Sequence, residues 1–152
     1  MGTPAAGRVA VMSIRPQFAE AILNGTKLVE FRKRRLAPDV TTVLIYATMP
    51  VGRIVGVFEA SGYDVDSPTA VWERHKRHAG ISRAGYRDYY RGAHRAVAIK
   101  VRDARRLARP IRLTELDAGL RAPQSFSYLQ LDPREHGVLG DSDLSDAIAI
   151  VG

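Results

Sequence analysis

Five cationic side chains and one carboxylate lie within nine residues in the first third of the chain. Residues 25–32 read Gly-Thr-Lys-Leu-Val-Glu-Phe-Arg, and the basic run Lys33, Arg34 and Arg35 follows directly. Lysine and arginine donors engage phosphate oxygens, whereas a carboxylate among them orients an arginine or takes a proton from a nucleophile. The alternative is an exposed basic strand with a weak ion pair between Glu30 and Arg32, worth under about 1 kcal/mol.

The same residue types meet the requirements of RNA cleavage. That reaction needs a base for the 2′-hydroxyl, an acid for the leaving oxygen, and cations for the charge that develops on phosphorus. Glu30, Lys27 and Arg32 are the candidate catalytic residues for these roles. Strand alternation places Lys27 on the face opposite Glu30, so the two converge only if Lys27 lies in the turn before the strand.

The charge of the whole chain favours a polyanionic partner. The 152 residues carry a net charge of +7, and the sequence pI is near 10.1. Residues 131–152 hold one basic and five acidic residues, so residues 1–130 alone carry +11. The phosphates of a nucleic acid would neutralise this positive charge, and the release of their counterions would favour binding. A solvated basic surface accounts for the charge equally well. Arg102, Arg105, Arg106, Arg109 and Arg112 form a second basic stretch, which either extends a phosphate track or is a solvated edge.

Composition restricts the class of protein. An apolar fraction of 45% predicts a folded globule, and 152 residues leave room for one domain. Without cysteine there is no disulfide framework and no thiolate metal site. No apolar run is long enough for a signal peptide or a membrane span, which predicts a cytoplasmic protein without a membrane partner. His75 and His78 lack a third ligand in the sequence, so we expect no metal and no cofactor.

The pattern of apolar residues predicts short strands interspersed with brief helices. Strands are expected over residues 9–14, 27–33, 42–47, 53–60 and 93–101. Helices are expected from Pro16 to the Asn24-Gly25 stop, over residues 67–78, from Ser82 to Gly92, and over residues 113–120. Without a regular βαβ alternation, this order predicts an α+β fold with a small barrel or a strongly curved sheet of five or six strands. We expect residues 131–152 to form an acidic, partly mobile tail after a domain of residues 1–130.

One family resembles this chain in its motifs. Gly25-x-Lys27-x-x-Glu30-x-Arg32 follows Ser-Ile-Arg-Pro at residues 13–16 and a helix that ends in Ile-Leu-Asn at residues 22–24. This arrangement resembles the ASCH domain of the PUA-like superfamily. Residues 45–51, 54–59 and 122–126 resemble later motifs of a prokaryotic subgroup, so the similarity covers about residues 9–129.

The resemblance implies a fold, a cleft and a partner. It implies a small PUA-like β-barrel with short flanking helices, a cleft floored by residues 25–32, and binding of RNA, single-stranded or structured. The expected nucleic-acid contacts are Lys27, Arg32, Lys33, Arg34, Arg35, Arg53, Gln124 and Ser125.

The family also admits catalysis of two kinds. Some members are reported to cleave RNA, and others to hydrolyse the amide of acetylated cytidine with a lysine, a threonine and a glutamate. Lys27 matches that lysine, but Glu30 stands in the place of the threonine and Ala79 in the place of the glutamate. Whether the chain is an enzyme is therefore open, and a metal-independent ribonuclease is favoured over an amidohydrolase acting on a modified nucleoside. A non-catalytic regulatory or ligand-binding module is the remaining alternative.

Overall fold

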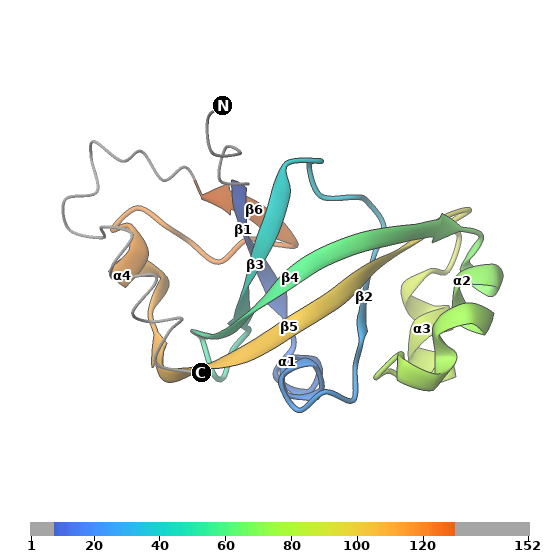
Figure 1. Cartoon of the computed structure of the whole chain (residues 1–152), viewed down its shortest axis with the longest axis horizontal. Coiled ribbons are helices and arrows are strands. Elements are labelled where there is room, and N and C mark those ends of the chain that lie inside the picture. The colour runs from blue at the N-terminus through green and yellow to red at the C-terminus, as the bar shows by residue number, and fades with distance from the viewer. Residues whose placement is uncertain (1–7, 130–152) are drawn as a thin grey trace.

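The computed structural model describes residues 8–129, which form one six-stranded sheet with helices at its ends and over one side (Figure 1). The proposed acidic tail, residues 131–152, and the domain boundary at residue 130 lie outside this range. In chain order the elements are β1 (Arg8–Ile14), α1 (Pro16–Leu23), β2 (Val29–Arg32), β3 (Val40–Ala47), β4 (Arg53–Asp66), α2 (Pro68–His75), the short 3-10 helix η1 (Lys76–His78), α3 (Arg83–Tyr89), β5 (Ala96–Ile111), α4 (Leu113–Leu116) and β6 (Phe126–Leu129). None of the helices in this range is long and apolar enough to cross a membrane.

The sheet has the strand order β2-β5-β4-β3-β1-β6. β1 and β3 run parallel, and every other neighbouring pair is antiparallel. The predicted α+β class and strand number are confirmed. β2 and β6 lie at opposite edges and do not pair, so the described strands form an open sheet rather than a closed barrel.

Two long strands join the halves of this sheet. β4 has 14 residues and β5 has 16, and they pair along most of their length with several register shifts. At one end β2 adds to β5, where α2 and α3 cover the sheet; at the other end β5 leads into α4 (Figure 1). The sequence predicted shorter strands, over residues 53–60 and 93–101. The extra residues of β4 are mostly half-buried, and those of β5 are mostly charged and exposed, so both extensions lack the apolar alternation of a buried strand.

Helix boundaries follow local chemistry. Pro16 occupies the first turn of α1, where the missing N–H costs nothing. The side chains of Ser67 and Ser82 cap α2 and α3 by accepting hydrogen bonds from Ala70 N and Gly85 N. Gly25, with φ of +85°, ends α1 and directs the chain toward β2. These starts and stops agree with the sequence prediction.

Packing between β4, β5 and α1 generates a test of the fold. A Cβ at Gly56 would lie 2.7 Å from the carbonyl oxygen of Arg105 and 2.5 Å from the Leu23 side chain. Gly56→Ala is therefore expected to lower the free energy of unfolding by roughly 1–3 kcal/mol, measured by urea denaturation. Gly62, on the same strand, is the matched control, because its Cβ would meet only Lys100 Cδ at 3.6 Å. Gly62→Ala should change stability by less than about 0.5 kcal/mol, and equal effects of the two changes would contradict this packing.

Candidate nucleic-acid site

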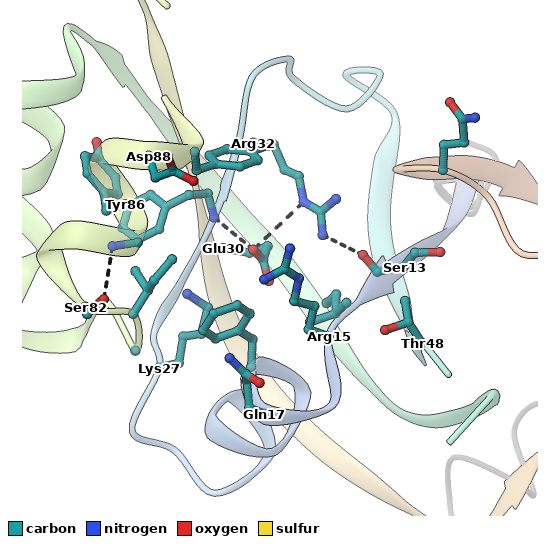
Figure 2. Close-up of a pocket in the computed structure, with 18 residues that line it drawn as sticks. Ser13, Arg15, Gln17, Lys27, Glu30, Arg32, Thr48, Ser82, Tyr86 and Asp88 are labelled. Atoms are coloured by element: carbon teal, nitrogen blue, oxygen red, sulfur yellow. Dashed lines mark hydrogen bonds and ion pairs between the residues drawn. The ribbon is translucent and has the colours of Figure 1, made fainter. Parts of the chain in front are cut away.

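A cavity of about 910 Å³ opens between the start of α1, the segment entering β2, and α3 (Figure 2). Its apolar wall includes Phe18, Phe31 and Tyr86, and Gln124 reaches it from the segment before β6. The ionisable lining residues comprise three cations and two carboxylates beside two tyrosines: Arg15, Lys27, Arg32, Glu30, Asp88, Tyr86 and Tyr89.

Lys27 is almost completely buried, with 2% of its surface exposed. Its Nζ donates a hydrogen bond to the backbone carbonyl of Ala79 and lies 4.9 Å from the centre of the Phe31 ring. Burial lowers the pKa of this ammonium group, while the negative charge of Glu30 acts in the opposite direction. The cavity therefore contains a lysine that gives up its proton more readily than a lysine in water.

Backbone geometry makes room for this lysine. Gly80 has φ of +65°, and a Cβ there would lie 2.6 Å from the Cβ and Cγ of Lys27. Two backbone hydrogen bonds hold the segment around it: Lys27 N donates to Ala21 O at 3.0 Å, and Leu28 N donates to His78 O at 3.0 Å. The turn is thereby held between α1 and the helical region.

Glu30 and Arg32 face the same cavity from β2. Glu30 is 7% exposed, and its Oε1 accepts a hydrogen bond from Phe31 N at 3.1 Å. Arg32 donates to Ser13 O at 2.8 Å and to Ser125 Oγ at 3.1 Å, while its Nε lies 3.9 Å from Glu30 Oε1. Glu30 Oε2 and Arg32 Nε are buried and have no hydrogen-bond partner within the described residues. A buried acceptor and a buried donor without partners are costly, and a ligand in the cavity would satisfy both.

The structure shows that Lys27 and Glu30 face the same cavity, although strand alternation alone would place them on opposite faces. β2 begins at Val29, so Lys27 precedes the strand and is not bound by its alternation. Lys27 and Glu30 consequently line one cavity together with Arg32 (Figure 2). Ala79, which the resemblance aligned with a glutamate, contributes only its backbone carbonyl oxygen, which accepts the hydrogen bond from Lys27.

The other predicted contacts lie outside the cavity lining, with the exception of Gln124. Lys33, Arg34 and Arg35 are exposed on the loop after β2, and Lys33 Nζ lies 5.1 Å from the ring centre of Tyr89 at the cavity wall. Ser125 is held by Arg32 at the cavity edge. Arg53 donates to its neighbour Gly52 O.

Several cavity residues were not among the predicted site residues, notably Arg15 and Tyr89. Arg15 lines the cavity, is exposed, and makes no ion pair with a described residue. Its position after β1 and before Pro16 is the signal that could have identified it, because strand ends beside helix starts often carry functional groups. Tyr89 also lines the cavity and is 39% exposed, whereas Tyr86 and Tyr90 are buried at 2% and 3%.

The second basic stretch is largely neutralised. Arg102 pairs with Glu59, Arg106 with Glu20, and Arg109 with Glu115, at distances of 2.6 to 3.1 Å. These carboxylates come from β4, α1 and α4, so three of the five arginines are paired, whereas Arg105 and Arg112 make no ion pair with a described residue. This stretch offers less positive charge to phosphates than its composition indicated.

His75, at the end of α2, has a structural partner. His75 Nε2 lies 2.7 Å from Asp64 Oδ2, and Arg74 donates to both oxygens of that carboxylate at 2.8 Å. These hydrogen bonds, from Arg74 above all, lower the pKa of Asp64 to about 2. Within residues 8–129 no group of three or more histidine, aspartate or glutamate side chains is arranged to hold a metal ion.

Similarity to known proteins supports the family resemblance that the sequence motifs indicate. The family model of the ASCH domain matches residues 12–105. The ASCH domain-containing ribonuclease of Zymomonas mobilis is 38% identical over 125 residues, which span 80% of this chain and 84% of that protein.

Solved structures agree as well. The crystal structure of ASCH from Zymomonas mobilis superposes with a TM-score of 0.76 at 36% identity, and the match covers 84% of this chain and 91% of that one. The N-terminal domain of Staphylothermus marinus McrB has a TM-score of 0.52 at 10% identity, again over 84% of this chain and 91% of that one, which is a likeness of fold alone. The matched family model and the relative that is 38% identical over the aligned residues lead to one conclusion: this chain belongs to the ASCH domain family.

Proposed function

We propose that the cavity binds single-stranded RNA and cleaves its backbone. The observation that carries this proposal is the convergence of Lys27, Glu30 and Arg32 on one cavity, with Glu30 Oε2 and Arg32 Nε lacking partners within the described range. A relative of 38% identity is named a ribonuclease, which supports the same reaction class.

The three side chains supply a complete transesterification. Glu30 Oε2 accepts the proton of the RNA 2′-hydroxyl, and the 2′-oxygen forms a bond to phosphorus as the bond from phosphorus to the 5′-oxygen breaks. Lys27, whose pKa burial lowers, gives a proton to the departing 5′-oxygen. Arg32 Nε donates to the phosphate oxygen on which charge develops. The products are a 2′,3′-cyclic phosphate and a 5′-hydroxyl.

The surface around the cavity suits an unpaired strand. Tyr89 presents a partly exposed ring at the cavity wall, where a base can stack, and stacking requires a base free of its duplex. Lys33, Arg34 and Arg35 continue from β2 as exposed cations that can follow the phosphates. Binding and chemistry are therefore assigned to neighbouring but different residues.

The exposed basic run should control affinity. Replacing Lys33, Arg34 and Arg35 together with alanine is expected to weaken binding of single-stranded RNA and to lower the slope of log affinity against log salt by up to about 2, since each lost phosphate contact removes about 0.7. Fluorescence anisotropy at several salt concentrations measures both quantities.

The matched control for this change removes the same charge elsewhere. Arg102, Arg106 and Arg109, which are paired with carboxylates, are replaced with alanine together and should leave affinity within about threefold. If both triple changes weaken binding equally, affinity depends on net charge and not on this surface.

The role of Glu30 separates chemistry from binding. Glu30→Gln keeps an oxygen for Phe31 N but removes the base, so cleavage of bound RNA should slow by about 10²–10⁴-fold while affinity is retained. Single-turnover cleavage of end-labelled RNA, resolved by electrophoresis, measures the rate. An RNA with one 2′-deoxynucleotide at the cleaved position should resist the unaltered protein, and cleavage of that RNA at the normal rate would refute the mechanism.

Burial of Lys27 should cost stability. Because the pKa of Lys27 is lower in the folded chain, unfolding takes up protons between the two pKa values, so the free energy of unfolding rises with pH toward the usual lysine pKa of 10.5. Lys27→Met removes the buried charge and should stabilise the protein by about 1 kcal/mol near neutral pH, the lost bond to Ala79 offsetting part of the gain.

Urea denaturation at about pH 7 and about pH 10 measures the gain, which should shrink at the higher pH. Lys33→Met is the control, since Lys33 is exposed and its replacement should give no pH-dependent difference. A gain for Lys27→Met that is independent of pH would show that the buried lysine carries no charge penalty.

A further inference from the structure

A second hollow, of about 410 Å³, lies between α2 and α3. Its α3 residues are Arg83, Tyr86, Arg87 and Tyr90, whereas the first cavity uses Ser82, Gly85, Tyr86, Asp88 and Tyr89 of the same region. At 100° per residue these two sets occupy opposite faces of the helix, and Tyr86 lies between them. The two hollows thus share α3 as their dividing wall.

Aromatic rings form the floor of the second hollow. The ring of Trp72, on α2, lies 4.8 Å from that of Tyr86, and Tyr86 lies 4.8 Å from Tyr90. The Tyr86 hydroxyl donates to Pro68 O at 2.7 Å and the Tyr90 hydroxyl to Arg32 O at 2.8 Å. With their polar ends already bonded, the rings are fixed in place, and Trp72 remains partly exposed for stacking.

Two guanidinium groups stand beside this floor. Arg83 and Arg87 are one turn apart on α3, both are exposed, and neither makes an ion pair with a residue in the range 8–129. Three other cations of the helical region are paired with carboxylates: Arg74 with Asp64 and Asp66, Lys76 with Glu73, and Arg91 with Asp88. Arg83 and Arg87 border the aromatic floor of the second hollow.

We infer that the α2–α3 hollow is a second nucleotide subsite for the RNA strand whose cleavage site is the first cavity. Trp72 stacks a base, and Arg83 and Arg87 hold its phosphate, a combination that fits an unpaired nucleotide. An RNA is favoured over a protein partner because the two hollows adjoin a single helix, and a helix is about 10–12 Å wide, which a strand crosses within a few nucleotides. This inference rests on the proposed function of the first cavity.

The chain provides its own reporter for this subsite. Trp72 is the only tryptophan among the 152 residues, so intrinsic tryptophan fluorescence reports on this hollow alone. Oligouridylates of three and ten nucleotides are titrated into the full chain, with fluorescence and anisotropy measured together. We expect the ten-nucleotide RNA to quench Trp72 and to bind at least about tenfold more tightly than the three-nucleotide RNA.

Variants test which side chains are responsible. Arg83→Ala combined with Arg87→Ala should weaken binding of the ten-nucleotide RNA about tenfold and lower its salt slope by about 1.4, or about 0.7 for each lost phosphate contact. Arg106→Ala combined with Arg109→Ala removes the same charge from paired positions and should leave both values unchanged. Trp72→Phe should keep most of the affinity and Trp72→Leu should lose it, which distinguishes stacking from packing.

The outcomes separate the two proposals. If the ten-nucleotide RNA binds and is cleaved, but neither Trp72 fluorescence nor the arginine pair responds to it, the second subsite is wrong and the first cavity stands. If neither RNA binds the unaltered chain, the proposed function fails and the subsite fails with it.

Discussion

The ammonium group of Lys27 is held out of water by Phe18 and Phe31 and donates one hydrogen bond, to the carbonyl oxygen of Ala79. That bond joins the turn after α1 to the segment between η1 and α3, two regions 52 residues apart in the sequence. The backbone bond from Leu28 to His78 runs beside it. The cavity therefore has a buried positive charge at the junction of two of its walls, and the free-energy cost of burying that charge is part of forming the site.

A series of aromatic contacts also joins β2 to α3 and α2. Phe31 on β2 packs edge to face against Tyr86 on α3, with ring centres 4.8 Å apart, and Tyr86 contacts Trp72 on α2. Tyr90, whose hydroxyl bonds to Arg32 O, fixes the backbone of β2 from the other side. The strand that bears Glu30 and Arg32 is thus supported by the helices that line both hollows, which gives the site the rigid backing that preorganised polar groups need.

Short-range sequence signals predicted the helix boundaries and the cluster of charged residues around Glu30. The helix stop at Asn24-Gly25, the serine caps of α2 and α3, and the cluster around Glu30 depend on neighbours in sequence, and they were foreseen. What was missed depends on distant contacts. The partner of Arg106 is Glu20, 86 residues away, so the neutralisation of the second basic stretch could not be read from composition. Tyr89 and Tyr90 are adjacent in sequence, and only the packing of α3 shows which one reaches the cavity. Catalytic roles for Lys27, Glu30 and Arg32 stay predictions.

The pairing of arginines along β5 has a consequence for how a partner arrives. On the outer part of β5, residues 102–111, Glu59, Glu20 and Glu115 pair with three of the four arginines and leave Arg105 without an ion pair in the described range. Around the two hollows, Arg15, the three cations of the loop after β2 and two arginines of α3 are exposed and make no ion pair with a described residue. Exposed cations without an ion pair are therefore denser around the two hollows than along the outer part of β5. A polyanion diffusing nearby experiences a torque as well as an attraction, and it is turned toward the hollows before contact. The association rate can then be altered by changing charges on the far side of the sheet, and the affinity by changing groups inside the cavity.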